Sequence, residues 1–329
     1  MGVFPFFLRL WPPGIPAEFS ISGTRPARFS LVWPNGSGTS SKEDKVHTYP
    51  ECIPCILRAS LTAGRLSGKG EEELWSALQE AAQVCAAWER EKPPIALGAE
   101  VAAVLKRKLG QGDPFWKAKK EGNAAVLRLY PALKERVRSS EDPLFEALRL
   151  SAAGNALDLG VHPEVHAEEA LSLALRQPLG RWDYELFQKH LKEAESVLYL
   201  ADNAGEIVVD RILIEELLAL GKRVTLAVRG GPILNDVTLA DLAEVGIPRE
   251  VEIISTGSDL PGVFLPLSSA DFLARFHRAE LILSKGMGNF EGLHGERGPI
   301  FFLFQAKCYP VAQEAGVKVG SLVLLGPRG

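Results

Sequence analysis

The sequence predicts an α/β protein in which an N-terminal all-helical domain packs on a C-terminal Rossmann-like domain, with a mostly parallel sheet in a three-layer arrangement. Two observations support this class. Between about residues 50 and 193, apolar side chains recur at spacings of three and four, which is typical of amphipathic helices. After Ser196, short apolar runs alternate with helical segments, which is the pattern of successive strand–helix–strand units.

The 329 residues therefore divide into three predicted parts. Residues 1–46 are rich in Pro, Gly, Ser and aromatic side chains without a helical or strand period, and they are either a disordered extension or a mis-assigned start. Residues 47–193 form the helical domain, in which one helix begins near Pro143 and extends to Gly160. Residues 194–329 form the α/β domain that carries the chemistry.

Five apolar runs are the predicted strands of this second domain: residues 196–201, 222–230, 250–255, 280–284 and 317–325. Helices are expected after the first two of them, at residues 207–221 and 237–246.

Composition excludes several classes of protein. The net charge of −4 and pI near 6.0 argue against a broad nucleic-acid or anionic-membrane surface. No apolar run approaches the length of a membrane span. Four cysteines are too few for a disulfide scaffold in a chain of this length, which predicts a reducing, cytoplasmic setting. The oligomeric state stays open.

Polar side chains follow the predicted strands, where ligands bind in open α/β sheets. The residues concerned are Asp202, Asn203 and Glu206 after the first strand, Asn235 and Asp236 after the second, Thr256, Gly257, Ser258 and Asp259 after the third, and Lys285, Asn289 and Glu291 after the fourth. Four such groups at one edge of a sheet predict a site.

Asp202 and Asn203 supply a carboxylate and an amide oxygen side by side, which suits Mg²⁺ or Mn²⁺. Either residue could instead cap the helix that begins near Glu206. A further oxygen ligand after the next strand, Asp236, favours the metal. Lys285 ends a strand at a Gly-rich turn, where a lysine can bind a phosphate as a point charge.

Other nucleotide and hydrolase motifs are missing. The segment KGMGNFEG has the spacing GxGxxxG and follows the fourth strand, whereas a dinucleotide fingerprint opens the domain. The chain contains neither GxxxxGK[ST] nor GxSxG, which excludes a nucleotide-triphosphate loop and a serine-hydrolase elbow.

Seven segments, in order, resemble the signature blocks of the damage-control phosphatase family (the former domain of unknown function 89). Those in the second half are ADNAGEIVVD, GGPILNDVT, STGSDLPG and LSKGMGNFEG. In the first half, YPECIPC resembles the opening of the prokaryotic, cysteine-bearing branch, and DPFWKAKKEGN and GNALD also match. The resemblance covers about residues 48 to 325.

The resemblance implies a phosphatase that uses a divalent cation (Mn²⁺, Mg²⁺, Co²⁺ or Ni²⁺) to hydrolyse phosphate monoesters of small metabolites, such as sugar phosphates or damaged phospho-metabolites. It assigns the metal to Asp202, Asn203 and Asp236 and the phosphate to Lys285. Asn155, from the helical domain, would reach the same site, with Thr256, Gly257, Ser258, Asn289 and Glu291 as further substrate-binding candidates and Glu206 as a catalytic one. Direct attack by water and a phospho-aspartyl intermediate on Asp202 both stay open.

Two other functions compete with a phosphatase. A methyltransferase using S-adenosylmethionine would need a Gly-rich loop after the first strand and an acid at the end of the second, and Arg229 stands there instead. A non-catalytic sugar-phosphate-binding protein would not need the two acids Asp202 and Asp236.

Cys52 and Cys55 form a CxxC pair with three interpretations: structural, metal-binding or redox-active. A structural zinc needs four ligands, and the chain has no second CxxC. The pair is expected to open a helix, which would lower the thiol pKa.

Overall fold

A computed structural model of the chain describes residues 46–157 and 167–327. Its α-helices are α1 (Cys52–Leu66), α2 (Glu71–Ala86), α3 (Pro94–Leu109), α4 (Trp116–Arg138), α5 (Pro143–Gly154), α6 (Ala167–Leu175), α7 (Tyr184–Glu193), α8 (Glu206–Ala219), α9 (Ala270–Arg278), α10 (Gly286–Leu293) and α11 (Tyr309–Ala315). Its strands are β1 (Leu179–Trp182), β2 (Ser196–Leu200), β3 (Arg223–Val228), β4 (Glu252–Ser255), β5 (Ile282–Lys285), β6 (Ile300–Gln305) and β7 (Leu322–Leu325).

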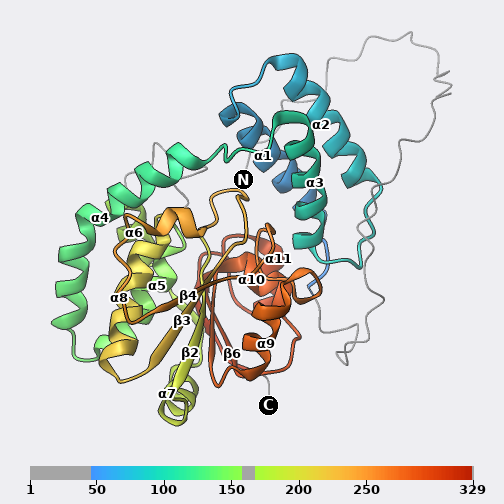
Figure 1. Cartoon of the computed structure of the whole chain (residues 1–329). Helices are drawn as coiled ribbons and strands as arrows, with labels where there is room; N and C mark the ends of the chain where they lie inside the picture. The colour runs from blue at the N-terminus through green and yellow to red at the C-terminus, as the bar shows by residue number, and fades with distance from the viewer. Residues whose placement is uncertain (1–45, 158–166, 328–329) are drawn as a thin grey trace, which may run out of the picture. The chain divides into compact units, whose positions relative to one another are not determined.

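The strands form one sheet in the order β1-β7-β6-β5-β2-β3-β4 (Figure 1). Strands β2 to β6 are mutually parallel, β7 runs antiparallel to β6, and β1 pairs parallel with β7. The predicted fold class, with its mostly parallel sheet, is confirmed. Strands β1 and β6 are not among the predicted strands.

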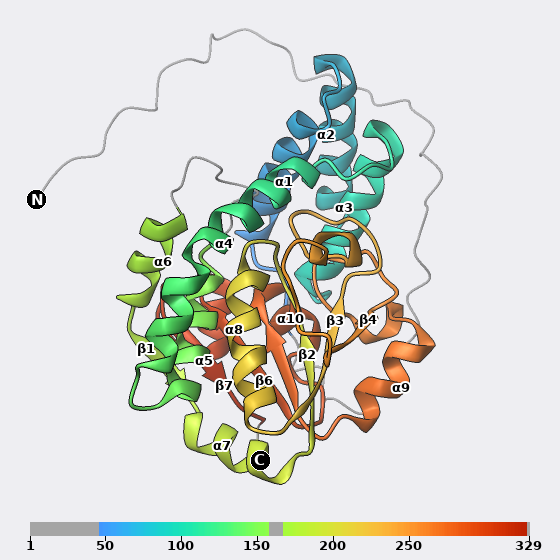
Figure 2. The same ribbon diagram turned by 60° about the vertical axis from the view of Figure 1, so that its left-hand side comes forward.

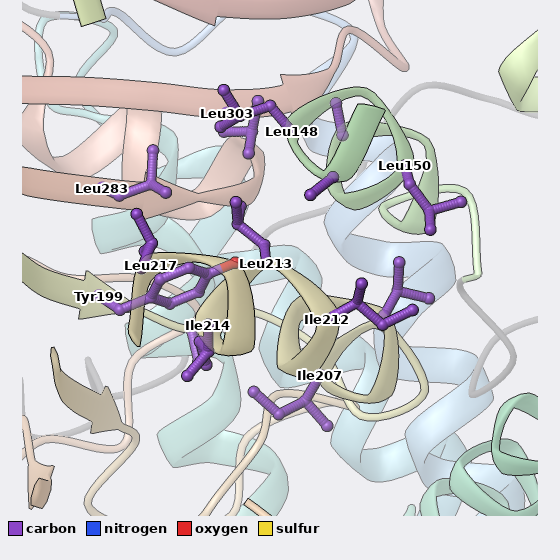
Figure 3. Packing of buried hydrophobic residues seen from close by; sticks show 14 of the residues in the cluster. Leu148, Leu150, Tyr199, Ile207, Ile212, Leu213, Ile214, Leu217, Leu283 and Leu303 are labelled. Carbon is purple, nitrogen blue, oxygen red and sulfur yellow. The ribbon is translucent and has the colours of Figure 1, made fainter. Parts of the chain in front are cut away.

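Residues alternate between the two faces of the sheet, as parallel strands buried on both sides require. In β2, Val197 and Tyr199 pack with α5 and α8, whereas Leu198 and Leu200 pack with α9, α10 and α11. Figure 3 shows Tyr199 among the leucines and isoleucines of α8 and α5. The sheet therefore has a helical layer on each face (Figures 1 and 2).

Helices α1, α2 and α3 pack around a small core of their own (Ala81, Cys85, Leu97 and Val101). In Figures 1 and 2 they lie together beyond the ends of the central strands. Lys106 of α3 forms an ion pair with Asp259, which follows β4, so this helical group contacts the edge where the strands end. None of the described helices has the length and apolar character needed to cross a lipid bilayer.

Two predicted helices differ from the structure. The helix expected from Pro143 to Gly160 already ends at Gly154. The helix expected at residues 237–246 is not an α-helix. Residues 237–246 contain only a 3₁₀ turn, Leu239–Leu242. The Asp241 carboxylate accepts hydrogen bonds from the backbone N–H and the hydroxyl of Thr238, at 2.8 and 2.7 Å, which closes the turn. The predicted boundary at residue 193 stays a prediction, although α5 packs against α8 and β6 across it.

Candidate metal centre

The site begins at the carboxyl ends of β2 and β5. The chain continues from β2 to β3 and β4 on one side and then returns to place β5 on the other, so β2 and β5 flank the point where the strand order reverses. Open α/β sheets bind ligands at such a point. Asp202 follows β2, and Lys285 is the last residue of β5.

Backbone hydrogen bonds join the loops that follow β2 and β3. The Val237 N–H donates to the Asp202 carbonyl at 2.8 Å, and the Ala204 N–H donates to the Asn235 carbonyl at 2.9 Å. Asn203 and Asp236 thereby pair as an isolated antiparallel β-bridge. The structure thus brings the three predicted metal ligands together, although Asp236 lies 33 to 34 positions further along the chain than the other two.

Asp202 is buried, with 6% of its surface exposed. Its Oδ2 accepts hydrogen bonds from the Asn203 and Asn155 side-chain amides, at 2.6 and 3.1 Å. Burial raises the pKa of Asp202 well above its usual value, and the carboxylates of Glu206 and Asp236 raise it further. Burial and the neighbouring acids therefore disfavour the ionised form of Asp202 unless a cation compensates its charge.

Gly286 allows Asp202 to occupy this position. A Cβ atom on Gly286 would overlap the Asp202 carboxylate, and the glycine has φ +77°, a conformation that other residues rarely adopt. The Gly-rich turn after β5 therefore brings backbone against a candidate metal ligand.

Lys285 and Glu206 form a buried network beside this carboxylate. The Lys285 Nζ donates to Glu206 Oε1 at 2.6 Å, to Asp210 Oδ1 at 2.7 Å and to the Ser151 carbonyl at 3.1 Å. The Asn155 amide bridges Glu206 Oε2 and Asp202. Burial would lower the pKa of Lys285, but Asp210 and Glu206 raise it above its usual value, so the lysine stays charged.

The other predicted substrate-binding residues lie in different surroundings. Thr256, Gly257 and Ser258 follow β4 beside Gly230, whose N–H donates to the Ser258 carbonyl at 2.8 Å. The Asn289 amide bonds to the backbone of Lys285, Ala201 and Val263. Glu291 lies on α10, where burial raises its pKa to about 7. None of these assignments to substrate is tested, and they stay predictions.

Arg229 is the main residue that sequence reasoning left without a role. It directly follows β3, its Nε donates to Asp236 Oδ2 at 2.6 Å, and its Nη2 lies 3.5 Å from Asp202 Oδ1. The rule that selected the acids also selects Arg229, because it too lies at the carboxyl end of a strand.

Two residues of the DPFWKAKKEGN segment also hold the site. The Lys119 Nζ forms ion pairs with Asp113 and Asp241, both at 2.7 Å, and donates to the Asp236 carbonyl at 3.2 Å. The Asn123 Oδ1 accepts a hydrogen bond from the Gly205 N–H at 2.6 Å, so this backbone donor at the start of α8 already has an acceptor in the protein. Both side chains are buried and support the loops around the acids.

The CxxC pair opens α1, as expected, and Cys52 lies at its first position. Burial, together with the nearby Glu291 and Cys308, raises the pKa of Cys52 to about 12, the reverse of the expected effect of the helix start. The described residues contain no cluster of three or more His, Cys, Asp or Glu side chains arranged to hold a metal ion. The metal-binding and redox interpretations stay untested.

A cavity of about 210 Å³ adjoins the loop that carries Asp236. Pro232, Ile233 and Leu234 form one wall, and aliphatic residues of α1 and α3 form another. No predicted site residue lines it. Leu234 has φ +44°, the one positive φ among the described non-glycine residues, so the loop is strained beside the acids.

Residues 48–323 match the family model described as the damage-control phosphatase ARMT1-like domain. The chain belongs to this family. A damage-control phosphatase of Pyrococcus horikoshii, PH1575, is 33% identical over 281 residues, which cover 84% of this chain and 96% of the relative. A damage-control phosphatase of Archaeoglobus fulgidus is 31% identical, covering 83% and 97% of the two chains.

A solved structure agrees with this assignment. The crystal structure of the Pyrococcus horikoshii protein, described as a member of the DUF89 family, matches with a TM-score of 0.77 and 32% identity, over 86% of this chain and 99% of that one. The resemblance found in the sequence is therefore confirmed. Membership of the damage-control phosphatase family supports a phosphatase role with a small metabolite as substrate, and it suggests a divalent metal cofactor.

Proposed function

We propose that this protein is a divalent-metal-dependent phosphatase that hydrolyses phosphate monoesters of small metabolites, such as sugar phosphates or damaged phospho-metabolites. Asp202, Asn203 and Asp236 would hold the cation. The observation that carries the proposal is the convergence of these three residues through the joined loops after β2 and β3. Family membership supports the reaction class.

The charges around the site fit a divalent cation. Four buried carboxylates (Asp202, Glu206, Asp210 and Asp236) contact two buried cations, Arg229 and Lys285. The Asn203 amide nitrogen donates to Asp202 and Glu206, which leaves its oxygen for a metal. Carboxylate and amide oxygens are the ligands that Mg²⁺ and Mn²⁺ prefer.

A bound cation would supply Lewis-acid stabilisation of the charge that develops on the phosphoryl group. The protein's own residues orient its ligands. Asn155 fixes both Asp202 and Glu206 through one amide, and Lys285 fixes the other oxygen of Glu206. Glu206 is thereby held at the start of α8 beside Asp202. The catalytic role proposed for it is to orient an attacking water molecule.

The first test is phosphate release from a panel of phosphometabolites. Chelated protein would be re-supplied with Mg²⁺, Mn²⁺, Co²⁺ or Ni²⁺, with Asp202→Ala and Asp236→Ala in parallel. We expect turnover that needs the metal and falls to background in both variants. Glu244→Ala is the matched control, because this exposed acid pairs only with Lys120 among the contacts described.

Failure of folded, metal-loaded protein to release phosphate from any ester would contradict the proposal. Binding of sugar phosphates without turnover would then favour the non-catalytic protein, and binding of S-adenosylmethionine would favour the methyltransferase. If turnover is found, the stereochemistry at phosphorus separates the two chemical routes. Direct attack by water inverts the configuration of a chiral phosphate ester, whereas two displacements through a phospho-aspartyl intermediate on Asp202 retain it.

A further inference from the structure

The lysine expected on the phosphate is already fully engaged. Lys285 is completely buried, and its ammonium group has three N–H donors. They go to Glu206, Asp210 and the Ser151 carbonyl. To bind a phosphoryl oxygen, Lys285 would have to leave two buried carboxylates, which is unfavourable.

The arginine at the end of β3 is in the opposite situation. Arg229 is 1% exposed, and only its Nε donates a hydrogen bond, to Asp236. Among the residues that the structure describes, neither Nη1 nor Nη2 has a hydrogen-bond acceptor. Burying the donors of a guanidinium without acceptors is costly, so an acceptor missing from the protein itself is expected.

The position of these donors indicates the missing acceptor. Nη2 lies 3.5 Å from Asp202 Oδ1, so a group that reaches this carboxylate also reaches the guanidinium. The backbone of Gly230 packs on Gly257 and Ser258, because a Cβ at Gly230 would come within 2.7 Å of them. The Ser258 hydroxyl, also buried, has no hydrogen-bond partner within the described chain.

We propose that Arg229 binds the phosphoryl group of the substrate, with two oxygens on Nη1 and Nη2 and with Ser258 Oγ as a further donor. The inference deepens the proposed phosphatase function and rests on it for the identity of the anion. A planar guanidinium matches two oxygens of a tetrahedral phosphate, and such paired bonds are strong in a buried setting. Arg229 thus takes the role that the family resemblance implies for Lys285.

Binding of inorganic phosphate to the Mn²⁺-loaded protein, measured by calorimetry, tests this inference without turnover. We expect Arg229→Met to weaken phosphate binding by about 10²-fold. The affinity for Mn²⁺ alone should be unchanged or higher, because a competing cation is removed from Asp202 and Asp236. Arg211→Met is the matched control, since this arginine pairs with Glu215 on α8, and both affinities should be retained.

Unchanged phosphate affinity in Arg229→Met would overturn the inference and leave Arg229 as a counter-ion of the acids. Absence of phosphate binding by the wild-type protein would overturn it as well. If Arg229→Met does not fold, Arg229→Lys provides the test. Loss of the paired hydrogen-bond geometry should weaken phosphate binding about 10-fold, and an unchanged phosphate affinity would contradict the inference. Phosphate binding through Arg229 in a protein that hydrolyses no ester would refute the proposed function alone.

Discussion

Lys285 and Arg229 are both buried cations at the carboxyl ends of strands, β5 and β3, that lie on either side of β2. Their surroundings nevertheless differ. Every N–H of Lys285 has an acceptor in the protein, whereas two of the three nitrogens of Arg229 have none among the described residues. A saturated cation stabilises the fold and orients its partners. A cation with spare donors is prepared for a ligand, so the difference separates structural support from binding.

The comparison predicts the largest loss of stability when the saturated cation is removed. Lys285→Met leaves Glu206 and Asp210 buried without compensation, so the free energy of unfolding should fall by about 3–5 kcal/mol. Denaturant unfolding measures it, and Mn²⁺ should stabilise this variant and the wild-type protein equally, so that the difference between them remains. Adding Asp210→Asn to this variant should recover part of it, and a Lys285→Met protein of wild-type stability would show that the network is not structural.

Asp210 gives the same network a pH dependence. Burial raises its pKa to about 6 from 3.8, with Lys285 opposing and Glu206 adding to the increase. The folded state then binds more protons than the unfolded state between about pH 4 and 6, so the free energy of unfolding falls as the pH rises through this window. The contribution is on the order of 3 kcal/mol.

The measurement is denaturant unfolding of metal-free protein from pH 4 to 7, compared with Asp210→Asn. Asp202 has a raised pKa as well, so the difference between the two curves isolates Asp210. Parallel curves would show that Asp210 titrates normally in the folded protein.

The sequence predicts those parts of the site whose position follows from the order of the strands. It does not predict the contacts that depend on how helices pack and where their side chains point. The alternation of strands and helices predicts that Asp202, Asn203 and Asp236 follow adjacent parallel strands, and parallel strands bring their carboxyl ends together whatever the side chains do. The partners of Lys285 could not be predicted in this way. Ser151 and Asp210 lie 134 and 75 positions away, and the lysine meets them because α5 packs against α8.

Removal of the Arg229 guanidinium should lower the stability of the protein only when no divalent cation is bound. Arg229→Met leaves Asp202 and Asp236 without their guanidinium, so chelated protein is expected to lose stability. A divalent cation replaces the lost charge, and at 100 times its dissociation constant it should stabilise the variant by about 2.7 kcal/mol. Thermal unfolding with and without Mn²⁺ checks this. If one fixed Mn²⁺ concentration narrows the stability difference from wild type as much for Lys285→Met as for Arg229→Met, the two cations are equivalent and the distinction fails.

The smallest expected change in stability concerns the backbone against Asp202. Gly286 and Gly221 have nearly the same φ, +77° and +78°, but a Cβ on Gly221 meets nothing within 4 Å, whereas one on Gly286 overlaps the Asp202 carboxylate. Gly221→Ala should therefore cost only the strain of a positive φ, about 1–2 kcal/mol. Gly286→Ala should cost more, because Asp202 must also move.

Mn²⁺ binding distinguishes the two glycines most sharply. Displacement of Asp202 should lower the Mn²⁺ affinity of Gly286→Ala by about 10–100-fold, the range found when the supports of a metal ligand are altered. Gly221→Ala should bind Mn²⁺ as the wild-type protein does, since its turn lies between α8 and β3, away from the acids. Equal Mn²⁺ affinities in both variants would mean that the metal does not need Asp202 where the structure holds it, and would move the candidate centre elsewhere.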